Sequence, residues 1–232
     1  MIETALALLA AHVAADFLLQ SKQMAEGKDR PAWLLAHGGI VWLTALAALG
    51  GPAQALLPVT GLALVHMAID WTKTRFGDGL RPFLADQAAH LATIAAVAVL
   101  APGLAALPLP ALQAAVALGG LVLATRAGGI VVGKLMAGLA ADPPTRGLAN
   151  AGRIIGTLER GLIFLFVVVG QPAGIGFLIA AKSVLRFESA SKDTSAAEYV
   201  IIGTLASFGW GVLAAYGTLG ALGLLGFPGP LP

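Results

Sequence analysis

Hydrophobic residues in this chain form long runs that exceed the length of a buried helix in a soluble protein. Runs without Asp, Glu, Lys or Arg cover residues 31–69, 91–125, 161–181 and 199–232. A membrane-crossing helix needs about 20 mostly apolar residues, and Gly and Pro divide the chain into about eight such segments. The pattern therefore predicts an all-α, polytopic transmembrane bundle with helices near 2–20, 33–50, 55–72, 84–101, 110–126, 154–170, 174–188 and 197–217.

The charged residues are concentrated in alternate linkers, and this alternation predicts the topology. Lys and Arg accumulate in cytoplasmic loops, whereas the linkers between the charged ones here carry no charge. We therefore expect a multi-pass protein with both termini on the periplasmic side. The linkers expected in the cytoplasm are 21–32, 72–83, 126–153 and 187–196.

The segment after the fifth helix does not fit a simple crossing. A helix continued from 110 through 141 would be about 45 Å long, so Gly128 and Gly129 predict a break followed by an interfacial helix. The chain then divides into three parts. These are a four-helix unit at 1–101, a fifth membrane helix with an interfacial or cytoplasmic segment at 102–153, and a three-helix unit at 154–232.

Composition excludes several classes of protein. The chain of 232 residues is 58% hydrophobic and 11% charged, with a mean hydropathy of +0.86, which excludes soluble, disordered and coiled-coil classes. A net charge of +2 is too small for a surface that tracks nucleic acid. The first segment lacks a basic start and contains Glu3, His12 and Asp16, so we expect a retained membrane helix rather than a cleaved signal peptide.

The four histidines lie in the first 90 residues, all in predicted membrane helices. Three of them have a carboxylate four residues away, a spacing that places both side chains on one helix face. By the topology above, all four histidines lie at similar depth near the cytoplasmic side, so they predict one polar centre inside the bundle. The pairs are His12 with Asp16, His66 with Asp70, and His90 with Asp86; the fourth histidine is His37.

The histidines also suggest an internal repeat. The His-x-x-x-Asp pattern at His12 recurs at His66, 54 residues later, and His37 recurs as His90, 53 residues later. Each unit would be a pair of helices, so two crossings return the chain to the same side of the membrane. The sequence therefore predicts a parallel repeat of two helix pairs in the first half.

Imidazole and carboxylate groups together favour a divalent metal, with Zn first and Fe or Mn as alternatives. Cys is absent, so any ligands must be His, Asp or Glu. The alternative reading is that the pairs form interhelical hydrogen bonds without metal. The predicted ligands are His12, Asp16, His66, Asp70, Asp86 and His90, with His37 as a ligand or a proton shuttle.

Charged residues in the second half, together with two polar residues beside the pairs, are candidates for binding a substrate. Membrane carboxylates are functional candidates, and basic groups can hold an anionic headgroup. Snorkelling of the basic residues and salt bridges of Glu159 and Glu198 to Arg160 or Lys182 are the alternatives. The candidates for substrate binding are Lys73, Gln87, Lys182, Arg186 and Glu198, and those for proton transfer are Glu159, His37 and Asp86.

Further motifs carry a family resemblance. They are His12-x-x-x-Asp16-Phe17-x-Leu19-Gln20, His66-x-x-x-Asp70-x-x-Lys73, Phe83-x-x-Asp86-Gln87-x-x-His90 and Leu158-Glu159-Arg160. With these motifs the chain resembles a bacterial multi-pass membrane family catalogued as domain of unknown function 3307. The resemblance implies a location in the bacterial inner membrane, but it implies no catalytic activity. A looser similarity to membrane-bound metal-dependent hydrolases raises the expectation of a metal.

Three functions fit these observations. The first is a metal-dependent hydrolase of a lipid or lipid-linked substrate at the cytoplasmic leaflet. The second is an ion- or proton-coupled transporter, and the third is a non-catalytic scaffold, as a homo-oligomer or as a subunit of a larger membrane complex. The predicted outer helix halves contain few polar residues beyond Thr44, Gln54, Thr60 and Gln113, which favours a one-sided site over a transport path.

Overall fold

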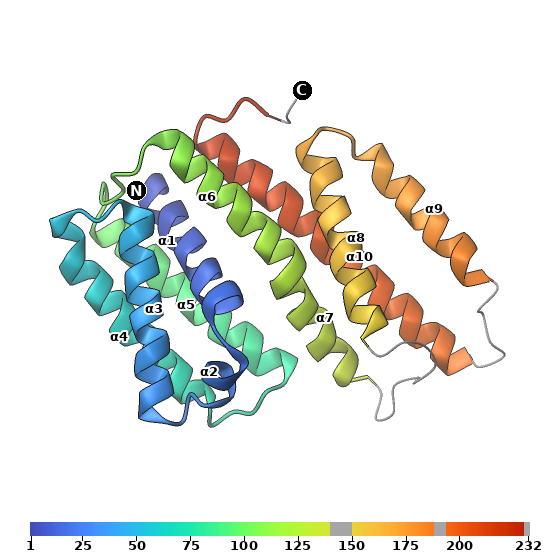
Figure 1. The fold of residues 1–232 in the computed structure, drawn as a ribbon, viewed down its shortest axis with the longest axis horizontal. Helices are drawn as coiled ribbons and strands as arrows, with labels where there is room; N and C mark the ends of the chain where they lie inside the picture. Colours follow the sequence, from blue (N-terminus) through green and yellow to red (C-terminus); the bar gives the residue numbers. More distant parts are fainter. Residues whose placement is uncertain (140–149, 188–193, 230–232) are drawn as a thin grey trace. The chain divides into compact units, whose positions relative to one another are not determined.

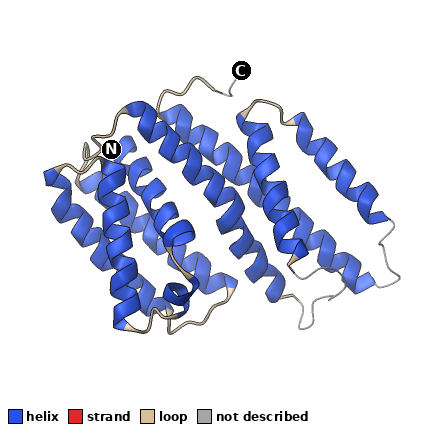
Figure 2. Cartoon of the chain, in the orientation of Figure 1, coloured by secondary structure: helices blue, strands red, loops and turns tan. Residues whose placement is uncertain are grey.

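The structure is a computed structural model that describes residues 1–139, 150–187 and 194–229. Every regular element among these residues is a helix (Figure 2), which confirms the predicted all-α fold. The charged linkers predicted at 126–153 and 187–196 lie partly outside the described residues.

Six described helices are long and apolar enough to cross a membrane. Many of their large apolar side chains are exposed; Leu57 and Leu100, for example, are each 84% exposed. Such exposure is costly in water and natural in lipid, so it indicates a multi-pass membrane protein. The six spans are Ile2–Leu19, Pro31–Leu49, Ala53–Lys73, Leu80–Leu100, Leu109–Ala137 and Ala197–Leu224.

Two of the eight expected membrane helices, at 154–170 and 174–188, form helices that are not among these six spans. Helix α8 (Ala151–Val168) contains Arg153, Glu159 and Arg160, and α9 (Ala173–Phe187) has an apolar part of only 12 residues, Ala173–Val184. The count of eight membrane crossings is therefore not confirmed.

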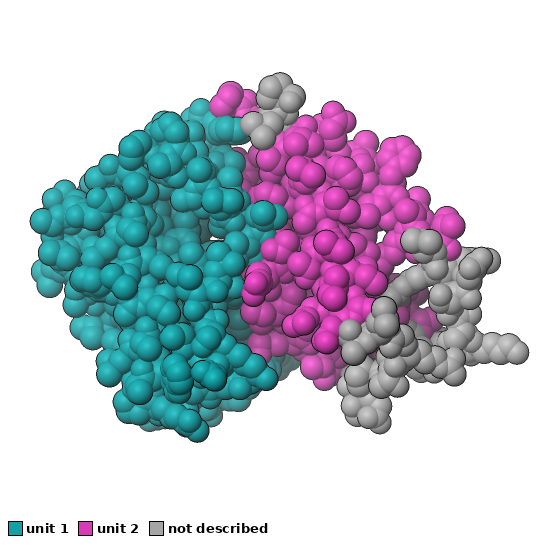
Figure 3. Space-filling model, viewed as in Figure 1, with its two compact units in different colours: residues 1–122, 221–227 teal, residues 123–220, 228–232 magenta. Residues whose placement is uncertain are grey.

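The chain forms two compact units (Figure 3). Unit 1 contains residues 1–122 and 221–227, and unit 2 contains residues 123–220 and 228–232. The three-part division drawn from the sequence stays a prediction.

Unit 1 is built on four long helices, with a fifth packed along one of them and one short helix. Helix α3 packs against α1 and α4, α5 packs against α4 and α1, and α6 packs along α1 (Figure 1). Leu8, Leu49 and Val59 are almost completely buried in an apolar core between these helices. The helices are α1 (Ile2–Ala14), α2 (Lys22–Glu26), α3 (Pro31–Leu49), α4 (Leu56–Lys73), α5 (Leu80–Leu100) and α6 (Leu109–Val122). The repeat of two helix pairs is not confirmed.

Local sequence sets the ends of α3. Pro31 occupies the first turn, where its missing N–H costs nothing. At the other end Gly50 has φ +83°, a left-handed conformation that glycine adopts without strain, and the Gly51 N–H donates to the Leu46 carbonyl. The helix therefore has fixed limits and holds His37 in its second turn.

Helix α1 continues into a π-helical turn, η1 (Ala15–Leu19), which carries Asp16. A π-turn widens the helix and re-aims the side chains in it, and such turns occur frequently at functional sites. The turn ends at Gln20, whose extended backbone leads into the short α2.

Unit 2 contains α7 (Gly128–Ala137), α8, α9 and most of α10 (Thr194–Leu224), with α8 packed against α7 and α9. The predicted break at Gly128 and Gly129 is absent, because a π-turn, η3 (Leu123–Ala127), leads directly into α7. A Cβ on Gly128 would lie 2.4 Å from Cδ1 of Trp210. The glycine therefore permits close packing and does not end the helix.

Candidate metal centre

Seven predicted site residues converge inside unit 1. They come from α1 with its π-turn, from α3, from α4 and from α5, which pack together in this unit. None of their side chains is more than 5% exposed. The seven residues are His12, Asp16, His37, His66, Asp70, Asp86 and His90.

Four of these side chains point at one spot, and we call them the quartet: Asp16, His37, His66 and Asp70. The Nε2 atoms of His37 and His66 lie 3.1 Å apart. Oδ1 of Asp16 lies 3.4 Å from the His37 Nε2 and 3.5 Å from the His66 Nε2. Oδ2 of Asp70 lies 3.5 Å from each of the same two nitrogens.

The distances around the two imidazoles of the quartet match those between neighbouring ligands of a tetrahedral metal ion. Zn–N and Zn–O bonds are about 2.0–2.2 Å long, and a tetrahedron's edge is about 1.6 times its centre-to-corner distance, so neighbouring ligand atoms should lie about 3.3–3.6 Å apart. The five separations that involve the two imidazole nitrogens run from 3.1 to 3.5 Å. The two imidazoles and either carboxylate are therefore spaced like three neighbouring ligands of a tetrahedral ion.

The two imidazole nitrogens lie within hydrogen-bond distance of each other, whereas the imidazole–carboxylate distances fit hydrogen bonding poorly. A charge-assisted N–H···O bond is about 2.7–2.9 Å long, whereas the imidazole–carboxylate contacts of the quartet are 3.4–3.5 Å. Among the described residues, the buried oxygens Asp16 Oδ1 and Asp70 Oδ2 of the quartet, and Asp86 Oδ1 beside it, have no hydrogen-bond partner. Buried anionic oxygens without a partner are costly, so the quartet could hold a cation.

A second group adjoins the quartet, and we call it the trio: Asp70, Asp86 and His90. Nε2 of His90 lies 3.5 Å from Oδ1 of Asp70 and 3.5 Å from Oδ1 of Asp86. Asp70 thus belongs to both groups, with one oxygen facing each. The trio, like the sets His37–His66–Asp70 and His12–Asp16–His66, could hold a metal ion.

Lysines pair with both carboxylates of the trio. Lys28 Nζ donates to Asp70 Oδ1 at 2.5 Å, and Lys73 Nζ donates to Asp86 Oδ2 at 3.2 Å. Sequence reasoning did not single out Lys28, which lies in a charged linker and was interpreted through topology alone. No feature of the linker sequence distinguishes it from the exposed Lys22.

Gln87 links the trio to His12. Its Nε2 donates to Asp86 Oδ2 at 3.1 Å, and its Oε1 lies 3.3 Å from Nε2 of His12. The other ring nitrogen of His12 lies 3.7 Å from Asp16. His12 therefore contacts the quartet from its edge, whereas His37, which has no carboxylate four residues away, lies within it.

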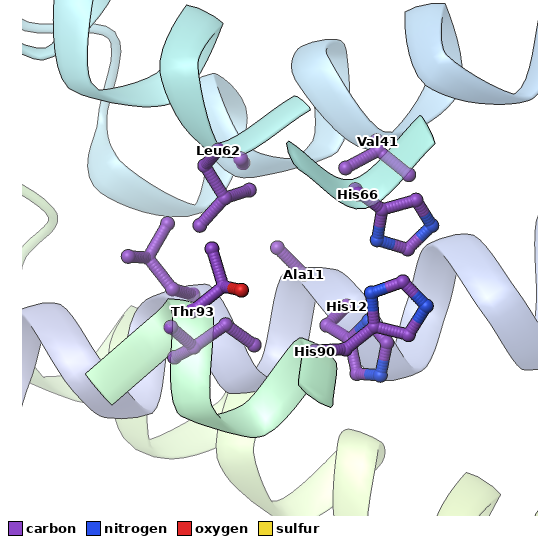
Figure 4. A pocket seen from close by; sticks show the side chains of 10 residues that line it. Ala11, His12, Val41, Leu62, His66, His90 and Thr93 are labelled. Carbon is purple, nitrogen blue, oxygen red and sulfur yellow. The ribbon is translucent and has the colours of Figure 1, made fainter. Parts of the chain in front are cut away.

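A small pocket, with room for about one water molecule, adjoins the imidazoles (Figure 4). His12, His66 and His90 lie together at one end of it, and Leu62 and Thr93 lie at the other. Apart from Thr93 and these histidines, its lining is apolar. The centre therefore has an apolar side as well as a charged one.

The second-half candidates lie in unit 2. Lys182 Nζ donates to Glu159 Oε2 at 2.7 Å and lies over the ring of Phe208, so both charges are already paired. Glu198 is exposed, and the side chain of Arg186 lies outside the described residues. The predicted roles of these residues stay predictions.

Arg160 holds the π-turn of unit 2. Its Nε donates to the Ala124 carbonyl at 2.9 Å, Nη2 donates to the Thr125 carbonyl at 3.0 Å, and Nη1 donates to Ser207 Oγ at 2.7 Å. Trp210 Nε1 donates to the Leu123 carbonyl at 2.8 Å. These side chains satisfy three successive carbonyls of the turn, which gives the buried Arg160 a structural role.

The fold and the site together define a helical membrane protein with a buried His/Asp centre that could hold a metal ion. Residues 5–111 match a family model described as "Protein of unknown function (DUF3307)", which confirms the resemblance for the first-half motifs. The Leu158-Glu159-Arg160 motif lies outside the matched segment. The matched segment contains the whole quartet and trio. Neither a curated protein nor a solved structure matches the chain, and the looser similarity to membrane hydrolases stays a prediction.

Proposed function

We propose that this protein is a membrane-embedded zinc-dependent hydrolase of a lipid or lipid-linked substrate. The observation that carries the proposal is the quartet, where the two imidazole nitrogens lie 3.1–3.5 Å from each other and from one carboxylate oxygen each of Asp16 and Asp70, as neighbouring ligands of a tetrahedral ion do. Zn prefers this geometry and these ligands, whereas Mn and Fe usually take more ligands.

The proposed reaction is the addition of water across an ester or phosphoester bond. The oxygen of water forms a bond to the acyl carbon or to phosphorus, the ester bond breaks, and the leaving alcohol takes a proton. A zinc ion in the quartet would supply Lewis acidity, and it would hold a water that ionises near neutral pH by expanding to five ligands or by releasing one carboxylate. Asp86 and His90 lie beside the quartet with unpartnered side-chain atoms, so they are placed to accept and return the proton.

Two features support an amphipathic substrate. The short helix α2 and the connector between α4 and α5 lie at the same end of the unit 1 helices (Figure 1), and both carry exposed charges. The pocket on the other side of the imidazoles is largely apolar. A molecule with a polar group at the membrane face and an apolar chain along the exposed apolar side chains of the helices matches these surroundings. We place that face in the cytoplasm from the charge of the linkers.

The same distribution of side chains weakens the transporter alternative. Beyond the centre, the buried residues described in unit 1 are apolar except for Thr4, whose hydroxyl accepts from the Leu104 N–H. A transport path needs polar groups towards both membrane faces. The arrangement supports a site that opens to one side.

The first test is the metal content of the protein purified in a mild detergent and measured by mass spectrometry. We expect about one zinc per chain, lost in His66→Ala and Asp70→Ala and retained in Thr93→Ala, which changes the pocket and removes no ligand. Substoichiometric metal that neither ligand substitution changes would contradict the metal site.

The second test separates a hydrolase from a scaffold. The zinc-loaded protein is incubated with a membrane lipid extract in ¹⁸O-labelled water, and the products are analysed for label. We expect labelled acid or phosphate that disappears in Asp86→Asn with zinc retained. Stoichiometric zinc without labelled products would instead support the scaffold.

A further inference from the structure

The two oxygens of Asp70 have different neighbours. Oδ2 faces the two imidazoles of the quartet, whereas Oδ1 accepts a hydrogen bond from Lys28 and lies 3.5 Å from His90. A carboxylate in this position can bridge two cations, one at the quartet beside Oδ2 and one at the trio beside Oδ1.

Charge is distributed unequally between the quartet and the trio. Each carboxylate of the trio has a lysine partner, Lys28 for Asp70 and Lys73 for Asp86. Asp16 of the quartet pairs only with histidines in the part of the chain that the structure describes. Buried carboxylates need a compensating positive charge, and the quartet is where that charge is missing.

We propose that the protein holds a single divalent ion, in the quartet, and that the ammonium group of Lys28 keeps a second ion out of the trio. This inference rests on the proposed metal site. A metal bound to Asp70 Oδ1 would lie about 2 Å from that oxygen, and Lys28 Nζ lies 2.5 Å from it. The two cations would then be within about 5 Å of each other in a buried site, where repulsion is weakly screened.

The position of Lys28 is built into the fold. It lies in the connector between α2 and α3 and is only 7% exposed, although the neighbouring residues of α2 are mostly exposed. The connector packs tightly, since a Cβ on Gly27 would lie 2.7 Å from Cδ1 of Trp33. A lysine held in this way acts as a permanent cation of the trio.

The experiment counts zinc ions per chain after purification and equilibration in a zinc buffer. We expect about one for the wild type and about two for Lys28→Met, because the trio then lacks its resident cation. Lys28→Arg keeps the charge and should stay at one, as should Lys22→Met on the exposed side of α2. Adding Asp86→Asn to Lys28→Met should return the count to one.

The outcomes separate this inference from the proposed function. A wild type without zinc would overturn both. A wild type with two ions, or a single ion in Lys28→Met, would overturn the role of Lys28 and leave the quartet intact. Lys28→Gln removes the charge and keeps a hydrogen-bond donor for Asp70, so it tests the inference even if Lys28→Met does not fold.

Discussion

The Nε2 atoms of His37 and His66 lie 3.1 Å apart inside unit 1, although 29 residues separate them in the chain. His37 comes from α3 and His66 from α4, two helices that pack along each other. Both nitrogens also face Asp16 and Asp70. The helix packing thus assembles a group of His and Asp side chains that no single helix contains.

Replacing His37 with alanine should therefore weaken zinc binding much more than replacing His12 with alanine. His37→Ala removes a nitrogen of the quartet, and we expect zinc affinity to fall by more than about 100-fold. His12→Ala removes a residue at its edge and should cost about 10-fold or less. Competition with a chelating dye measures both, and equal losses would mean that the quartet is not the metal site.

The sequence predicted the members of the centre better than their roles. The i,i+4 pairs identified Asp16 and Asp70 because one helix face carries each pair, and that relation is local. His37 has no local partner, and its central place depends on how α3 packs on α4. Lys28 was missed for a similar reason, since only the folded connector buries it.

The sequence predicts where helices occur better than it predicts where they end. Long apolar runs require helices in lipid, and nearly all described residues of the eight expected segments are helical except at segment ends. Gly128 was interpreted as a break, because sequence alone does not show that Trp210 packs where its side chain would be. Glycines with a packing role and glycines that end helices look alike without a structure.

The buried pair Lys28–Asp70 should contribute far more to stability than the exposed pair Lys22–Glu26. Asp70→Ala leaves a buried ammonium without its partner, which should lower the free energy of unfolding by about 3–5 kcal/mol. Glu26→Ala breaks an i,i+4 pair at the surface and should change little. The two variants are compared by thermal unfolding of the metal-free protein in detergent. Similar midpoints for Asp70→Ala and Glu26→Ala would show that the buried pair is not formed.

Gly38 offers a way to disturb the centre without changing any ligand. A Cβ at this position would lie 2.3 Å from Sδ and 2.7 Å from Cγ of Met67, so Gly38→Val should push α3 away from α4 and separate His37 from His66. We expect weaker zinc binding by at least about 10-fold. Gly39→Val is the matched control, since a Cβ there meets nothing within 4 Å. Equal zinc affinity in the two variants would contradict this dependence on helix packing.

Arg160 should be essential to the stability of unit 2 because it serves three acceptors in different directions. Arg160→Met leaves the carbonyls of Ala124 and Thr125 without their donors, and it should lower the midpoint of thermal unfolding by roughly 5–10 °C. Arg160→Lys should recover only part of this, because an ammonium group lacks the planar fork that reaches separate acceptors. The exposed Arg153→Met is the control for loss of a positive charge on the same helix. Full stability in Arg160→Lys would show that charge, and not the geometry of the guanidinium group, holds the π-turn.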